Sequence, residues 1–241
     1  MRRSEVFTTW PGRAALAVVA LALFAAAAVG VTYTPLFRLQ TIQIIGARHL
    51  SESDVLRLAG VERDANLAHL DLREAERALE RDPRVADATV VRHLPSTLSI
   101  DVIERHAVAV APTADDPGAV AADGTILPGV DFSGLPEIRA AVGVLSEEGQ
   151  DSALSALVAV PGDVRARVDA LVVQPDGSLV LEIADGPMVE YGPATSVSAK
   201  GEAMRAVLAW AADQDVELGV VDVAAPAAPT ARTLDGAPVR I

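Results

Sequence analysis

The stretch AALAVVALALFAAAAVGVTY, residues 14–33, runs for twenty residues without a charged side chain. A helix rises about 1.5 Å per residue, so a helix of this length covers about 30 Å, the thickness of the hydrocarbon core of a bilayer. We therefore predict a transmembrane helix over 14–33. Residues 1–13 are too few to fold, so the function is expected in the part of the chain that follows the helix.

The charges before this segment predict its orientation. Residues 1–13 carry three arginines and one glutamate, and basic flanks of a first apolar segment favour the cytoplasm. Trp10 and Tyr33 bracket the segment with rings that prefer the headgroup level. We expect a single-pass protein with a cytoplasmic N-terminus and extracytoplasmic C-terminal domains.

A cleaved signal peptide is the rival interpretation of the same stretch. Ala25-x-Ala27 or Ala26-x-Ala28 would serve as a cleavage site. The apolar run continues past these alanines to Tyr33, longer than the usual signal core of about 7–15 residues, which favours a retained anchor. Small residues also follow one face of the predicted helix and could pack on another membrane helix, namely Ala22, Ala26 and Gly30.

Composition narrows the class of protein. The chain has no cysteine, which excludes disulfides, thiolate metal sites and a cysteine nucleophile. Its formal net charge is −13, so it repels phosphate backbones and anionic surfaces, and we expect no nucleic-acid partner.

Beyond the membrane segment, local signals predict a β-α-α-β-β unit over residues 37–106. Strands are expected at 39–45, 85–91 and 98–104, and helices at 51–60 and 72–81. Ser51 with Asp54, and Asp71 with Glu74, have the spacing of helix N-caps. In the second strand, alternation predicts one inward face made of Ala86, Ala88 and Val90.

A second, mostly antiparallel β-domain is expected over residues 107–223, giving an α+β fold overall. Asp-Gly pairs between apolar runs predict type I′ hairpin turns, at Asp123-Gly124, Asp176-Gly177 and Asp185-Gly186. Helices are expected at 152–160, with Leu154, Leu157 and Val158 inward, and at 199–212. Residues 219–223 are predicted to form the last strand, because the Pro/Ala-rich tail 224–241 should not pair fully in a sheet interior.

The first unit resembles the POTRA domain of the bacterial cell-division family FtsQ/DivIB. The resemblance lies in a strand that ends at Gly46, in Asn66-Leu67, in Asp82-Pro83-Arg84-Val85, in Ala88-x-Val90-x-Arg92, and in Leu98-x-Ile100-x-Val102-x-Glu104-Arg105. His93-Leu94 departs from the family, whose members often carry an aromatic residue there. The second unit resembles the family's β-domain in Val189-x-Tyr191-Gly192, Lys200 and Val221-Asp222-Val223.

No catalytic, cofactor or metal site is predicted. The four histidines, His49, His69, His93 and His106, lack the spacing of a zinc site. Asp115-Asp116 and the Asp-Gly pairs are better explained by turn geometry than by glycoside hydrolysis. Lys200 has no serine three residues before it, so the S-x-x-K pattern is missing.

An anchored body without evident chemistry predicts an interaction protein. We expect a partner strand to add to an exposed sheet edge at the candidate residues Gly219, Val220, Val221, Asp222, Val223 and Arg232. The resemblance implies a non-catalytic scaffold at the division septum, with FtsB (DivIC)-like and FtsL-like single-pass proteins as partners. Two alternatives stay open: an exported cell-wall hydrolase, and a POTRA protein that handles polypeptides in secretion.

Overall fold

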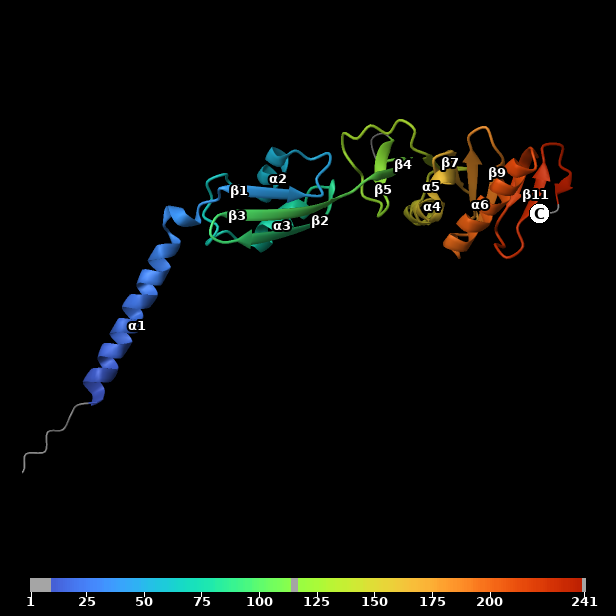
Figure 1. The fold of residues 1–241 in the computed structure, drawn as a ribbon. Coiled ribbons are helices and arrows are strands. Elements are labelled where there is room, and N and C mark those ends of the chain that lie inside the picture. The colour runs from blue at the N-terminus through green and yellow to red at the C-terminus, as the bar shows by residue number, and fades with distance from the viewer. Residues whose placement is uncertain (1–9, 114–116, 240–241) are drawn as a thin grey trace, which may run out of the picture. The chain divides into compact units, whose positions relative to one another are not determined.

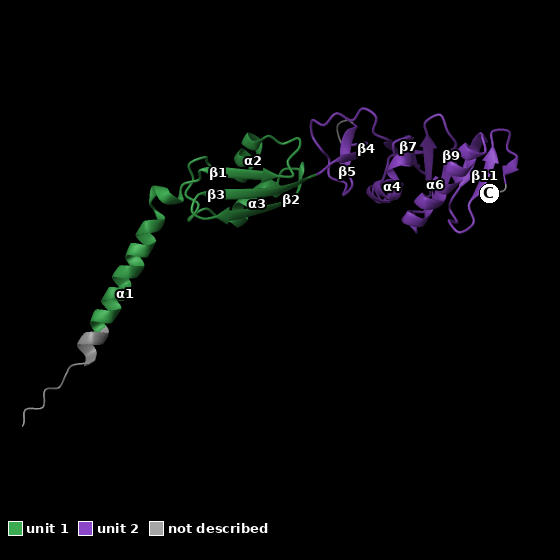
Figure 2. Ribbon diagram, viewed as in Figure 1, with its two compact units in different colours: residues 1–104 green, residues 105–241 purple. Residues whose placement is uncertain are grey.

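The computed structural model describes residues 10–113 and 117–239 (Figure 1). The chain divides into unit 1, Met1–Glu104, and unit 2, Arg105–Ile241 (Figure 2). Three predictions concern side chains outside the described part: the charge bias of residues 1–13, the interfacial position of Trp10, and the pair Asp115-Asp116.

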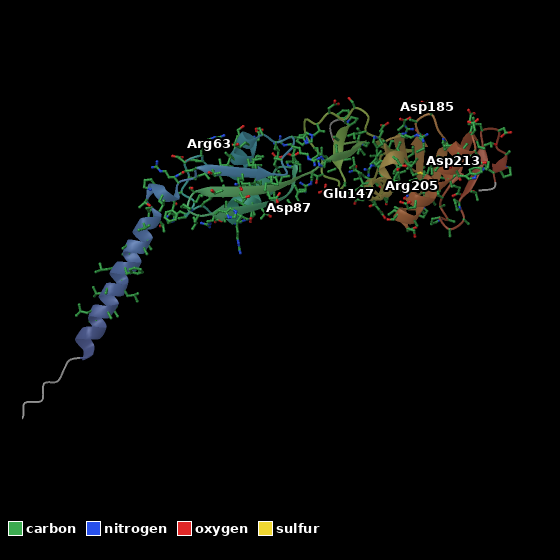
Figure 3. The ribbon with its side chains drawn as sticks, in the orientation of Figure 1. Arg63, Asp87, Glu147, Asp185, Arg205 and Asp213 are labelled. Carbon is green, nitrogen blue, oxygen red and sulfur yellow. The ribbon has the colours of Figure 1, made fainter. Side chains whose placement is uncertain are left out.

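Unit 1 begins with the long helix α1, Trp10–Thr32. Within the described residues, one helix is long and apolar enough to cross a membrane, in the window Ala15–Thr32 with mean hydropathy 2.5. None of that window is buried within the chain, and its central side chains carry only carbon atoms (Figure 3). An isolated helix with such a surface is stable in lipid, where its backbone groups are satisfied internally.

After the short 3-10 turn η1, Pro35–Phe37, the rest of unit 1 forms the predicted β-α-α-β-β arrangement. The elements are β1 (Thr41–Ile45), α2 (Glu52–Ala59), α3 (Leu72–Glu80), β2 (Val85–His93) and β3 (Thr97–Glu104). The sheet order is β1-β3-β2, with β1 parallel to β3 and β2 antiparallel to it. Both helices pack on one face of this sheet, around Val55, Leu79 and Ile100.

Local signals placed both helices correctly. The Ser51 hydroxyl accepts a hydrogen bond from the Asp54 N–H at 3.1 Å and forms a capping box, while the Asp71 carboxylate accepts from the Glu74 N–H. The prediction that Ala86 faces inward is wrong. A β-bulge between Val85 and Asp87 shifts the register, so Val85 is buried and Ala86 is exposed.

The end of β3 is joined to the loop after β1 by one buried carboxylate. Glu104 is 7% exposed and accepts hydrogen bonds from the backbone N–H groups of Arg48, His49 and Leu50 at 2.9–3.1 Å. Its Oε2 also lies 2.9 Å from His49 Nδ1. Burial alone would raise the pKa of Glu104, but these hydrogen bonds outweigh it and the pKa is lowered.

Gly46 begins the same loop and has a positive φ of 85°. A Cβ at this position would lie 2.1 Å from the carbonyl oxygen of Val102 on β3. The loop can therefore approach β3 closely enough to reach Glu104 only because residue 46 has no side chain.

Unit 2 contains one nine-stranded sheet of order β12-β11-β10-β9-β8-β7-β6-β4-β5. The strands are β4 (Ala107–Ala111), β5 (Gly118–Ala121), β6 (Glu137–Ala140), β7 (Val168–Val173), β8 (Leu179–Ile183), β9 (Met188–Gly192), β10 (Leu218–Asp222), β11 (Thr230–Thr233) and β12 (Pro238–Val239). The helices are α4 (Glu147–Ala159), α5 (Gly162–Arg165) and α6 (Val197–Asp213). The meander predicted over 168–191 is confirmed as the antiparallel strands β7, β8 and β9.

The Asp-Gly hairpin turns are present, but the predicted type I′ geometry is wrong. Gly177 has φ of 80° while Asp176 stays negative, and at the next turn only Asp185 is positive. The Asp176 carboxylate instead accepts a hydrogen bond from the Ser178 N–H at 2.9 Å. The aspartate side chain thus takes over part of the turn's hydrogen bonding.

Helices α4 and α6 cover one face of the large sheet through a continuous core that includes Leu157, Met204 and Val207. Charged side chains on these helices, such as Glu147, Arg205 and Asp213, lie at the surface (Figure 3). The prediction that Val158 faces inward is wrong, since it is 44% exposed. Helix α4 starts five residues before the predicted 152–160, at a Ser146 cap, and buries Ala153 and Ala156 beside Leu154 and Leu157.

Replacing the buried carboxylate should destabilise unit 1. Because an amide presents N–H groups to backbone N–H donors, we expect Glu104→Gln to lower the free energy of unfolding by about 2–4 kcal/mol at pH 7. The folded-state pKa is lowered, so the carboxylate's contribution is complete above its unfolded pKa of about 4.3 and is lost as pH falls below it. Urea unfolding of residues 33–241 at pH 7 and pH 3 measures both effects, with the exposed Glu80→Gln as the control. An equal loss at the two pH values would contradict this role.

Adding a methyl group at Gly46 should disrupt the same junction. We expect Gly46→Ala to cost about 2–4 kcal/mol, from the left-handed backbone together with the collision at Val102. Gly60 is a matched control, because it has φ of 66° and a Cβ added there would meet no atom within 4 Å. Gly60→Ala should therefore cost only about 1 kcal/mol. Similar losses in the two variants would show that close approach does not matter.

Candidate partner-binding edge

The predicted edge strand lies inside the sheet. Strand β10 pairs in parallel with β9 and antiparallel with β11, so both of its sides are occupied. Val221 and Val223 are fully buried in the core. The expectation that residues 219–223 end the sheet and leave an open edge is therefore wrong, and the tail 224–239 supplies two further strands.

The positions of the tail prolines explain this difference. Pro226 and Pro229 lie in the connection before β11, where they replace no ladder hydrogen bond. The Thr233 N–H donates to Ala237 O at 3.0 Å, so the next residue, Pro238, has its nitrogen on the side facing away from β11. A proline on that side leaves the pairing of β12 with β11 intact.

Sequence reasoning missed β12, although a signal for it was present. Asp235-Gly236 is another Asp-Gly pair, and Gly236 has the positive φ of 83° that closes the β11–β12 turn. The same criterion that located the β7–β9 meander would have located this hairpin.

The opposite edge of the sheet is covered by the chain itself. Along β5, the Leu127 N–H donates to Ala119 O at 2.8 Å and the Ala121 N–H donates to Thr125 O at 2.9 Å. Residues 125–127 thus occupy the outer side of β5, and in the described part of unit 2 the edge with unpaired backbone is β12.

In unit 1, a side chain protects part of the β2 edge. The Glu76 carboxylate on α3 accepts a hydrogen bond from the Val90 N–H at 2.9 Å. Strand β1 forms the other edge of that sheet, and there Ile42 and Ile44 are partly buried against the core. Edge β1 is therefore the second position at which a strand could add.

Arg232 lies next to the β12 edge. Its guanidinium is 3.8 Å from the Glu190 carboxylate on β9, across the intervening β10, and both side chains are about half exposed. A closer pair of the same residue types lies farther along the sheet, where Arg139 on β6 donates to both carboxylate oxygens of Glu182 on β8 at 2.7–2.8 Å. Of the predicted binding residues, only Arg232 is thus exposed and close to the open edge.

Two buried polar groups fix the loop between β9 and α6. Lys200 is 1% exposed, and its Nζ donates to Pro193 O at 2.7 Å and lies 5.3 Å from the centre of the Tyr191 ring. Burial lowers the pKa of Lys200, an effect that Asp222 on β10 opposes. The Tyr191 hydroxyl donates to Val197 O at 2.7 Å, and burial raises its pKa to about 12. These groups hold the backbone beside β10 in place.

Two of the histidines, His49 and His69, contact different partners. His49 contacts Glu104, and His69 contacts Thr32 and Tyr33. Among the described residues, no three acidic, histidine or cysteine side chains gather as a metal site. The small residues Ala22, Ala26 and Gly30 are all exposed on α1 within the described chain.

Comparisons with known proteins agree with this architecture. A family model described as "POTRA domain, FtsQ-type" matches residues 37–105. Curated proteins named "Cell division protein FtsQ" are similar over most of the chain. The protein of Mycolicibacterium smegmatis is 28% identical over 205 residues, which is 83% of this chain and 58% of the relative. That of Mycobacterium tuberculosis is 30% identical over 199 residues, or 80% of this chain and 60% of the relative.

A third relative, from Corynebacterium glutamicum, is 28% identical over 202 residues, covering 79% of this chain and 88% of the relative. The chain spans 58% and 51% of the first two relatives, from M. smegmatis and Caulobacter vibrioides. Those two relatives are therefore considerably longer than the region they share with this chain. The β-α-α-β-β unit and the family match together identify residues 37–105 as an FtsQ-type POTRA domain, and the similarity to proteins named FtsQ extends over 79–83% of the chain in these three relatives.

Proposed function

We propose that this chain is a non-catalytic, membrane-anchored scaffold of the bacterial division machinery. The names of its relatives support a role in cell division. Helix α1 would anchor the chain as a single-pass protein at the septum, with a cytoplasmic N-terminus and both units on the outer side. Units 1 and 2 would then position partner proteins rather than transform a substrate.

The observation that carries this proposal is the difference between the two edges of the large sheet. Residues 125–127 cover β5, whereas β12 has a neighbouring strand on one side only among the residues that the structure describes. An extended segment of a partner that adds to β12 would gain main-chain hydrogen bonds there. The described part of β12 has only two residues, so such a segment must also contact the face of the sheet beside it.

The face of the sheet beside β12 would also select a partner segment by its charge, through Arg232. Arg232 offers a guanidinium that is already oriented by Glu190 and stays about half exposed. An acidic side chain at the matching position of the partner strand would compete for this guanidinium, and the exposed pair costs little to separate. The family resemblance makes FtsB (DivIC)-like and FtsL-like single-pass proteins the proposed partners.

Removing β12 should abolish partner binding and leave the fold intact. We expect a chain that ends at Gly236 to lose co-purification of the FtsB-like partner, because both β12 residues that pair with β11 are absent. Mass spectrometry of the detergent-extracted complex measures binding, and circular dichroism checks the fold. Undiminished co-purification with the shortened, folded chain would rule out addition at this edge.

Reversing the charge near the edge should weaken the same complex. We expect Arg232→Glu to reduce co-purification by on the order of tenfold, as for a truncated charged contact at an interface. Arg139→Glu is a matched control, since Arg139 forms the same kind of cross-strand pair on the same sheet, away from β12. Equal effects of the two variants would indicate a general loss of stability instead.

Depletion of the protein separates the proposed function from other classes. A scaffold of division predicts filamentous cells with unsplit septa. Altered wall turnover with measurable hydrolysis by the purified chain would favour a hydrolase, and loss of surface proteins would favour secretion. Light microscopy and a glycan-release assay on the same culture decide among the three.

A further inference from the structure

The last turn of α1 is fastened to the POTRA domain. The Asn66 side-chain amide donates to Thr32 O at 2.8 Å, and Thr32 Oγ1 lies 3.0 Å from His69 Nε2. The Tyr33 and His69 rings stack with their centres 4.2 Å apart. The segment 66–69 therefore fixes the end of α1, in addition to the covalent connection.

The connection between α1 and β1 is held by backbone hydrogen bonds to two neighbouring segments. The Leu67 N–H donates to Phe37 O at 2.8 Å and the Leu39 N–H donates to Ala65 O at 2.9 Å. The turn between β2 and β3 lies alongside, because the Gln40 and Thr41 N–H groups both donate to Ser96 O. Residues 33–41, 65–69 and 93–97 thus form one end of the domain, the end that carries the helix.

This end exposes large apolar side chains. Tyr33 is 69% exposed, Leu36 on the connection is 57% exposed and Leu94 on the β2–β3 turn is 55% exposed. They come from two separate segments, which the hydrogen bonds of Gln40 and Thr41 to Ser96 O bring to the same end of the domain. Soluble proteins rarely expose large apolar side chains together in water, and such patches usually mark a contact site.

The charges at this end differ from those of the whole chain. The formal net charge is −13, but residues 33–41, 65–69 and 93–97 contain no acidic residue, Arg38 lies within them and Arg92 directly precedes the third segment. Arg92 reaches the carbonyl oxygens of Leu67 and Ala68 at 2.7 and 3.1 Å, while Arg38 is exposed. Aromatic, leucine and arginine side chains together are the composition of a surface that contacts lipid headgroups.

We propose that Tyr33, Leu36 and Leu94 form a lipid-contact surface, which holds the POTRA domain against the bilayer from which α1 emerges. The occupant is the lipid headgroup region rather than a protein, because the surface continues directly from a helix whose length and composition suit the bilayer. The contacts of Asn66 and His69 keep the domain in this orientation. This inference rests on the proposed membrane anchor and adds a second site of membrane contact.

The absence of cysteine from the chain allows a direct test with the full-length protein in nanodiscs. Single variants L36C and L94C carry an environment-sensitive fluorophore, and doxyl-labelled lipids serve as the quencher. I103C is the matched control, since Ile103 is 58% exposed in the same domain near the far end of β3. L21C, on the exposed middle of α1, reports whether the anchor itself lies in lipid.

We expect lipid quenching at positions 36 and 94 to exceed that at position 103 on the order of twofold or more, as for side chains at the headgroup level. Quenching at 94 as weak as at 103, with strong quenching at 21, would overturn the lipid surface while leaving the anchor in place. Weak quenching at 21 would overturn both. Protection of position 94 from both lipid and aqueous iodide quenchers would show a protein cover and also overturn the proposal.

A charge placed on the proposed surface provides a second measurement. In the L94C background, L36E should reduce lipid quenching at position 94 to the level of position 103. I103E in the same background should leave it unchanged, because Ile103 lies outside the proposed surface. Equal quenching in the presence and absence of L36E would overturn the cooperation of Leu36 and Leu94.

Discussion

The backbone groups along the sheet edges are the constraint on which both units depend. An unpaired N–H or C=O on an edge recruits whatever strand is nearby, so a protein must close the edges that it does not use. Residues 125–127 close β5, and the Glu76 carboxylate takes the Val90 N–H on β2. Within the described residues, β12 pairs with a strand on one side only, so this edge differs from β5 and from the part of β2 at Val90.

Local chemistry made much of the POTRA domain predictable. Ser51, Asp71 and Gly60 act within one helical turn of their own residues, so their roles follow from spacing alone. The bulge at Val85–Asp87 was not predictable in this way, because it depends on how β2 meets β3. Alternation in sequence assumes a regular register, and a single inserted residue reverses the faces that follow or precede it.

The candidate edge shows the same limit at longer range. A proline has no N–H to donate to a neighbouring strand. This prevents pairing only where a strand lies on the side to which that N–H would point. Pro238 faces away from β11, so the rule was correct and its application to the whole tail was wrong. Arg232 lies on β11, beside the edge strand β12, whereas residues 219–223, which were predicted to form the edge, are internal. Strand order joins residues far apart in the sequence, which periodicity does not reveal.

The buried polar groups could not be assigned from sequence, because their partners are backbone atoms. Glu104 binds amides more than fifty residues earlier in the chain, and Lys200 and Tyr191 bind carbonyl oxygens of one loop. Each group makes a hydrogen bond to the backbone of a connection and holds it in place, which accounts for its burial. In unit 1, the chain enters and leaves the sheet at opposite ends. Since β1 runs parallel to β3, the chain enters the POTRA sheet beside Thr97, at the end fastened to α1, and leaves it at Glu104, at the opposite end. Eight residues of β3 span about 26 Å. The Glu104 carboxylate therefore fixes the exit of the chain from the POTRA sheet, and the contacts of Asn66 and His69 fix the entry.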